Sequence, residues 1–326
     1  DMDYSFIDQL FSFKITDGAL YSGDLTGEGT FNFSEEDVPI DLSLFGRNMM
    51  LREVFPKVAN ALSPTVNLLQ HISGNMDALD FTTNIYGPSL KVYQQDIQNI
   101  DVAMTMDQNR QFSIQSVVIP FKKGGQLFAS GSLQDLKDVY LSYRGNNIQF
   151  SDVDPSVQST LVSDMEINGS LHVPLVSSFF KAPLDELTTT VDVKLNKGSL
   201  YGHQFDELRS SFYYEKGQLV LKKCVLDDLL SNVDIKGTFL GKVPKNVILR
   251  TRSLDLNESP LIQRFIPVFW KPFSGKLSSD LILQARHYSP GSLPNDDSYL
   301  SKVMVRGNVS IRDGFFQDQP FDQLDM

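Results

Sequence analysis

Residues that could carry chemistry are few in this chain and lie far apart. The four histidines have no second histidine at metal-ligand spacing: His71, His172, His203 and His287. The only cysteine, Cys224, follows Lys222 and Lys223 with no histidine nearby to activate it, and a single cysteine permits no intrachain disulfide. These patterns predict no metal site, no cofactor and no catalytic cysteine.

Glycine-rich and acidic motifs are also incomplete. Gly27-Glu28-Gly29 lacks the third glycine of a dinucleotide-binding loop, and Gly275-Lys276-Leu277 lacks the upstream glycine and the Ser/Thr of a phosphate loop. Adjacent carboxylates such as Asp227-Asp228 and Glu35-Glu36 are typical of solvated turns, because neighbours in sequence do not form an acid and base pair. The sequence therefore predicts a protein that is not an enzyme.

Composition narrows the possible partners. The 326 residues include 29 Lys+Arg and 40 Asp+Glu, giving a net charge of −11. Because proteins that bind nucleic acid normally carry a basic patch, this balance argues against nucleic acid as a partner. The chain holds no apolar run of about 18 residues and no signal peptide, so it predicts no membrane span. Since it starts at Asp1 and stops within a repeat, we expect a piece of a longer protein.

The elements that would position these residues are amphipathic strands. Apolar and polar residues alternate with period two in several segments, as in Phe11, Phe13 and Ile15, and Asp-Gly, Lys-Gly and Gly-Gly pairs separate such segments. This pattern predicts a mainly β fold of antiparallel strands with one dry and one wet face. Helical periodicity is weaker, and short helices are expected at 48–69 (an insert near 48–72), 154–162 and 259–270.

Internal repeats organise the chain. Asn196-Lys197-Gly198-Ser199-Leu200-Tyr201 echoes Thr16-Asp17-Gly18-Ala19-Leu20-Tyr21, and Phe205-Asp206-Glu207-Leu208 matches Phe321-Asp322-Gln323-Leu324. Gly74, Gly169 and Gly275 each begin a Gly-x-Leu or Gly-x-Met motif, which is expected to precede a new strand. We therefore expect an imperfect repeat of about a hundred residues: a β unit with the helical insert at 1–150, a β unit at 151–256, and a helix with a truncated unit at 257–326.

In their order, these motifs resemble the AsmA-like family of bacterial envelope proteins, of the TamB and YhdP type. Residues 191–241 fit best, and 11–33, 87–133 and 303–326 fit in part. The resemblance implies an elongated, curved, antiparallel β-sheet groove built from repeats. It also implies a periplasmic bridge, tethered to the inner membrane by a segment outside this chain, that moves phospholipids between the inner and outer membranes without catalysis.

The resemblance gives the alternating apolar residues a role, with phospholipid acyl chains as the partner. The candidate groove residues are Phe11, Phe13, Ile15, Val191, Val193, Leu195, Val233, Ile235, Phe239, Val309 and Ile311. A closed β-sandwich core would show the same alternation without any ligand. Because some members of the family assist outer-membrane protein assembly, the alternative function is a scaffold or chaperone that contacts an outer-membrane β-barrel protein. A carbohydrate-binding sandwich is disfavoured by the single tryptophan.

Overall fold

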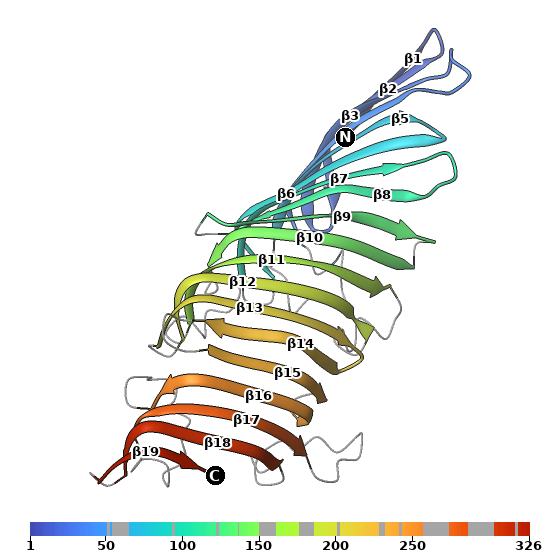
Figure 1. Cartoon of the computed structure of the whole chain (residues 1–326). Coiled ribbons are helices and arrows are strands. Elements are labelled where there is room, and N and C mark those ends of the chain that lie inside the picture. The colour runs from blue at the N-terminus through green and yellow to red at the C-terminus, as the bar shows by residue number, and fades with distance from the viewer. Residues whose placement is uncertain are drawn as a thin grey trace. The chain divides into compact units, whose positions relative to one another are not determined.

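The computed structural model shows an almost entirely antiparallel β protein (Figure 1). It describes residues 1–50, 53, 65–92, 95–121, 124–135, 137–149, 161–175, 186–200, 203–227, 232–240, 243–256, 274–285, 303–316 and 319–326. The strands are β1 (Met2–Ile7), β2 (Leu10–Leu20), β3 (Gly23–Asn32), β4 (Ile40–Met49), β5 (Val66–Asn75), β6 (Ala78–Val92), β7 (Gln95–Met106), β8 (Phe112–Pro120), β9 (Gln126–Gln134), β10 (Asp138–Gln149), β11 (Leu161–Pro174), β12 (Thr188–Leu200), β13 (His203–Glu215), β14 (Gln218–Asp227), β15 (Asn232–Leu240), β16 (Val243–Asp255), β17 (Lys276–Ala285), β18 (Val303–Phe316) and β19 (Gln319–Asp325).

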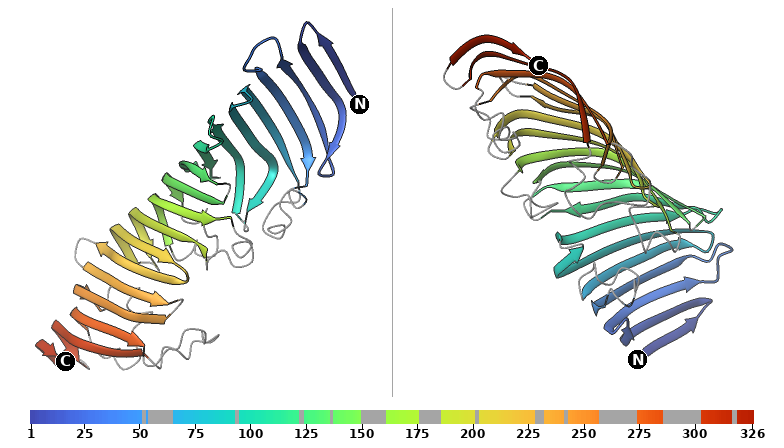
Figure 2. Two further views of the ribbon diagram at one scale, coloured as in Figure 1. Left: turned by 90° about the vertical axis from the view of Figure 1, so that its right-hand side faces the viewer. Right: turned by 90° about the horizontal axis from the view of Figure 1, so that it is seen from below.

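The chain divides into two compact units. Unit 1 comprises Asp1–Ile148 and Ser170–Glu186, and unit 2 comprises Gln149–Gly169 and Leu187–Met326. From β1 to β10 in unit 1, and from β12 to β19 in unit 2, each strand pairs antiparallel with the next strand in sequence. Figure 2 shows the successive hairpins and the bend along the longer strands.

Local sequence explains the hairpins. Lys216 and Gly217 both have positive φ, 47° and 77°, so they form the tight turn between β13 and β14. Between β5 and β6, the Asn75 side-chain oxygen accepts hydrogen bonds from the backbone N–H groups of Asp77 (3.1 Å) and Ala78 (2.8 Å). These short connections join neighbouring strands and produce a meander.

The sheets are single layers. In the part of the chain that the structure describes, extensive contacts join only strands that are neighbours in sequence. A single layer leaves both faces of its sheet without a second sheet against them, whereas a β-sandwich buries one face of each sheet.

The helical prediction near 48–72 is wrong at its C-terminal end, whereas Glu53 is helical and its backbone N–H donates a hydrogen bond to the Met50 carbonyl oxygen at 2.9 Å. Val66–Asn75 form β5, which pairs with β4 and β6. The spacing of Val66 and Leu69 imitates a helix, but Leu69 belongs to the polar face of a strand and is 43% exposed. Residues 161 and 162 of the second expected helix likewise belong to β11. The other residues of these two stretches, apart from the end of β4, lie almost entirely outside the described part, and 259–270 lies wholly outside it.

Irregularities recur near the ends of even-numbered strands. Positive φ angles of 45–55° occur at a single non-glycine residue in each of β4, β10, β12, β16 and β18, namely Asn48, Asn147, Lys197, Ser253 and Asp313. The next residue is buried in every case: Met49, Ile148, Gly198, Leu254 and Gly314. Because even strands run in the same direction along a meander, these kinks lie at one edge of each unit's sheet, where the residue after each kink is buried.

Candidate apolar binding face

Three cross-strand rows of side chains form the apolar face of unit 1. Directly paired residues on antiparallel strands share a face, so each row can be followed through the strand registers. The first row is Phe6, Phe11, Phe31, Ile40, Gly74, Leu79, Met106, Phe112, Leu133 and Val139. The second is Tyr4, Phe13, Gly29, Leu42, Ile72, Phe81, Met104, Ile114, Gly131 and Leu141. The third is Met2, Ile15, Gly27, Leu44, Gln70, Thr83, Val102, Val117, Ala129 and Tyr143.

Unit 2 has an apolar face built in the same way from β12 to β18. Its rows are Leu195, Leu208, Leu226, Val233, Thr251, Ser279 and Val309; Val193, Ser210, Cys224, Ile235, Leu249, Leu281 and Gly307; and Val191, Phe212, Leu221, Gly237, Val247, Leu283 and Val305. Each row therefore crosses seven paired strands, with few polar side chains among them.

All eleven candidate groove residues lie on the apolar face of their own unit. Phe11, Phe13 and Ile15 each belong to a different row of unit 1, and the other eight belong to unit 2. The candidates differ in how far they are buried. Val191, Leu195 and Ile311 are 7%, 2% and 0% exposed, whereas the other eight are partly exposed. The three buried side chains already contact protein, so they are less available to a ligand than the rest.

One cluster of buried side chains in unit 2 lies at the kinked edge. Leu254, Leu256 and Ile311 form this cluster, against which Val233, Leu277 and Phe321 pack. Gly314 lies opposite Phe321, and Gly198 lies opposite Phe205 in the same arrangement on β12 and β13. The repeated motif thus has a structural role, since a glycine leaves room for the phenylalanine ring of the paired strand.

The opposite face of unit 1 is mostly polar, with Phe45, Leu69, Val118 and Phe128 as its large apolar side chains in one row. In unit 1 one polar row runs through Ser5, Ser12, Thr30, Asp41, Ser73, Asp80, Thr105, Ser113, Ser132 and Tyr140. An open hollow of about 630 Å³ lies on this face beside Lys14, Glu28 and His71. Each strand therefore separates an apolar surface from a hydrated one.

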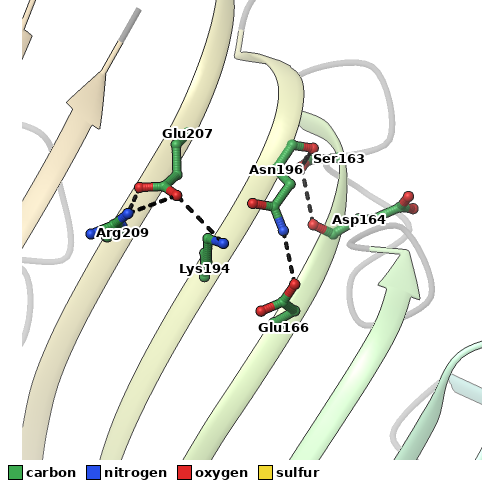
Figure 3. A network of polar contacts seen from close by, with 7 residues as sticks. All are labelled: Ser163, Asp164, Glu166, Lys194, Asn196, Glu207 and Arg209. Atoms are coloured by element: carbon green, nitrogen blue, oxygen red, sulfur yellow. Dashed lines mark hydrogen bonds and ion pairs between the residues drawn. The ribbon is translucent and has the colours of Figure 1, made fainter.

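A polar network ties the first strands of unit 2 together (Figure 3). Glu207 accepts hydrogen bonds from Arg209, which contacts it closely, and forms an ion pair with Lys194 at 3.5 Å. Hydrogen bonding to Arg209 is the main reason that the pKa of Glu207 lies below its ordinary value. On the neighbouring strands, the Asn196 amide donates a hydrogen bond to Glu166 at 3.0 Å. These contacts hold β11, β12 and β13 in register, beside an open hollow of about 300 Å³ lined in part by Glu166, Lys194 and Arg209.

The histidines with described side chains lie in separate places. His71 Nδ1 is 3.2 Å from Ser43 Oγ and 3.6 Å from Asp41 Oδ1, so one ring nitrogen makes both contacts. His172 Nε2 is 2.9 Å from Asp138 Oδ1, and its ring stacks on Tyr140 with centroids 4.5 Å apart. His287 and the side chain of His203 lie outside the described part. Within that part, no cluster of three or more metal-binding side chains occurs.

Cys224 lies on the apolar face of unit 2. It is paired with Ser210 on one side and Ile235 on the other. Burial raises the pKa of the Cys224 thiol, although a hydrogen bond with Ser210 opposes this effect. The thiol is therefore mostly protonated at neutral pH, and its chemical reactivity can report whether this part of the face is covered.

The sequence prediction missed most of the apolar face in unit 1. The residues contributed by β4 to β8 were not among the candidates, although Leu42, Leu44, Ile72, Phe81 and Met104 all follow the period-two pattern. These residues were overlooked because a helix was expected near 48–72 and because glycines in the same rows interrupt the apolar alternation. Searching for alternation through each strand and its predicted partner would have found them.

Among the described residues, no helix is long and apolar enough to span a bilayer. Comparisons with protein-family models, with curated proteins and with solved structures find no match to this chain.

Proposed function

We propose that this chain is a non-enzymatic lipid transfer protein that carries phospholipids with their acyl chains on the apolar face of each unit. The supporting observation is the set of cross-strand apolar rows, which run perpendicular to the strands without a second layer of strands over them in the described part. With strands about 4.8 Å apart, ten strands give each row of unit 1 a length of roughly 43 Å. An acyl chain can thus contact apolar side chains at successive positions along one row.

The energetics favour this cargo. Exposing an acyl chain to water costs about 0.8 kcal/mol per CH₂, so a sixteen-carbon chain costs on the order of 12 kcal/mol. Contact with the apolar face removes much of this cost. Because apolar contact is not directional, successive positions along a row have similar energies, which permits a chain to slide.

The polar face and the acidic charge would keep the lipid-carrying sheet hydrated. Headgroups would remain in water at the edges of the apolar face, while the polar row through Ser12, Thr30 and Asp41 keeps the other side of the sheet hydrated. The net charge of −11 favours solubility of a sheet that exposes so much apolar surface. The likeness to AsmA-like proteins supports a place in the periplasm, between inner and outer membranes, with a tether outside this chain.

Native mass spectrometry of the purified chain from a bacterial host tests this function. We expect phospholipid bound in more than one copy, identified after solvent extraction, because each unit has its own apolar face. A folded but lipid-free chain would contradict the proposal and would favour the scaffold alternative.

Cys224 provides an independent measurement on the same preparation. Bound phospholipid should slow alkylation of this thiol, and removal of lipid should restore the rate. In both states the rate should rise with alkaline pH, because the thiolate forms only as pH approaches the raised pKa. An alkylation rate that does not change with lipid content would place the bound lipid elsewhere.

A further inference from the structure

An aromatic patch lies on the apolar face of unit 1 at β1 to β3, formed by Tyr4, Phe6, Phe11, Phe13, Phe31 and Phe33. Phe11 and Phe31 have ring centroids 6.1 Å apart, and Phe31 stacks on Phe33 at 6.4 Å with an interplanar angle of 16°. Phe6 reaches Phe33 at 6.3 Å. These contacts support the rings against one another and limit their side-chain freedom, so little conformational entropy remains to be lost on binding.

The outer part of the aromatic patch faces solvent. Tyr4, Phe6 and Phe33 are 73%, 63% and 50% exposed, whereas the Phe11, Phe13 and Phe31 side chains are only partly exposed. Large aromatic side chains are enriched at protein interfaces and often dominate their binding energy. The aromatic patch thus differs from the apolar face of unit 2, whose rows are mostly aliphatic.

Carboxylates border the aromatic patch at one edge. The β1–β2 turn carries Asp8, and the segment after β3 carries Glu35, Glu36 and Asp37, all exposed. The Phe33 N–H donates a hydrogen bond to the Gln9 carbonyl at 2.8 Å, which brings the two segments together. Within the described residues, Asp8, Glu36 and Asp37 have no ion pair, so their charge is available to a cationic partner.

We propose that the aromatic patch is a docking site for an amphipathic segment of a partner protein, whose apolar side chains cover the rings while its Lys and Arg side chains lie against Asp8, Glu35, Glu36 and Asp37. Charge complementarity selects this occupant. An anionic phospholipid headgroup, such as that of phosphatidylglycerol, would be repelled by the same carboxylates. A second copy of this acidic chain, with its net charge of −11, would also be repelled. The inference goes beyond lipid transfer and does not depend on it.

A fluorescein-labelled amphipathic peptide of about 18 residues, made of Leu and Lys, provides the probe; this length gives five helical turns. Binding to the full chain is measured by fluorescence anisotropy, beside a matched peptide of Leu and Glu. We expect the Lys peptide to bind at least about tenfold more tightly than the Glu peptide, and its affinity to fall as salt screens the carboxylates. Equal binding of the two peptides, or no binding of the Lys peptide, would overturn the proposal.

Variants locate the binding site. The double variant Phe6→Ser, Phe33→Ser should weaken Lys-peptide binding about tenfold or more, and Glu36→Lys with Asp37→Lys should weaken it at least about threefold. The matched control is Phe315→Ser with Phe316→Ser, which changes two exposed rings of unit 2, 51% and 41% exposed, and should leave binding unchanged. Circular dichroism checks that each variant keeps its strand content.

Two other occupants give different results. If the double variant Phe6→Ser, Phe33→Ser loses binding to phosphatidylcholine and phosphatidylglycerol vesicles but keeps the Lys peptide, the patch is a lipid surface and the proposal is wrong. If it abolishes a dimer detected by sedimentation, the occupant is a second copy. Native mass spectrometry of the same variant separates this proposal from lipid transfer, because lipid bound to unit 2 should remain.

Discussion

At the scale of single residues, the pairing of glycine with phenylalanine explains the repeated sequence motif. Gly314 lies opposite Phe321, and a Cβ atom built on it would be 2.6 Å from Phe321 Cζ and in collision with the Ser274 carbonyl oxygen. Gly198 and Phe205 repeat the pairing. The Phe321 ring is able to pack under the kinked edge because Gly314 has no side chain.

Gly314→Ala should therefore destabilise unit 2. We expect a loss of about 1–3 kcal/mol, because the added methyl group displaces the Phe321 ring or the backbone of residue 274. Urea unfolding followed by circular dichroism measures the change. Gly87→Ala is the control, since a methyl group added there would meet no atom closer than 3.6 Å, and its stability should not fall. Equal stability of Gly314→Ala and wild type would refute this packing role.

Glu207 gives a stability contribution that depends on pH. Its pKa in the folded protein lies below the ordinary value of 4.5, chiefly through the hydrogen bond from Arg209. The unfolded chain therefore binds a proton more readily, so the stabilisation is present above about pH 4.5 and is lost as pH falls through the folded-state pKa. Glu207→Gln should lower the urea midpoint at pH 7, and the difference from wild type should shrink towards pH 3. Asp206→Asn is the control, because it removes the same charge from the neighbouring exposed residue. Its urea midpoint should differ from that of wild type by less than the midpoint of Glu207→Gln does.

At the scale of elements, a residue with positive φ bends each of five even strands and buries the residue that follows it. The kinks in unit 2 come from Lys197, Ser253 and Asp313, which are not glycines. A left-handed conformation costs a residue with a Cβ roughly 1–2 kcal/mol. The strain is offset by burial of the next side chain, as at Leu254, which is 3% exposed.

Ser253→Gly should stabilise unit 2 by up to about 1 kcal/mol. Glycine adopts the φ of 54° found at residue 253 without steric cost, and this gain exceeds the entropy that glycine adds to the unfolded chain. The urea midpoint is the measurement. Ser199→Gly, at an extended position of β12, serves as the comparison and should lose stability, because there only the entropic cost applies. A destabilised Ser253→Gly variant would show that the kink carries no strain.

The sequence was sufficient to predict the strands but not the register in which they pair. Alternation in Phe11, Phe13 and Ile15 was sufficient to identify a face, because every second side chain of a strand lies on the same side. The helix expected near 48–72 failed at β5, where Leu69 on the polar face disrupts the alternation. The row to which each apolar residue belongs could not be derived from single strands. Cross-strand register decides it, and that register depends on the turns and on the kinks at residues such as Asn48.

At the scale of the molecule, the described strands resemble half of a β-sandwich in each unit. A sandwich buries its apolar face against a second sheet, whereas extensive contacts among the described strands join sequence neighbours only. Ile235 is partly exposed although it lies in the middle of an apolar row of unit 2. A charged substitution at Ile235 therefore distinguishes a ligand-binding face from a closed core. On a ligand-binding face it should impair binding and keep the fold, whereas in a closed core it should unfold the unit.

Ile235→Asp and Val193→Asp should reduce lipid transfer while preserving the fold. Each introduces a carboxylate among apolar neighbours, where it opposes acyl-chain binding, and each position is already partly open to water, so the cost to stability should be about 1–2 kcal/mol. Transfer of a fluorescent phospholipid between vesicles and the lipid count by native mass spectrometry provide the measurements. Thr238→Asp, on the polar face of the same strand, should transfer lipid as wild type does. If Ile235→Asp unfolds unit 2, or if all three variants transfer lipid equally well, the apolar face is a structural core rather than a path for lipid.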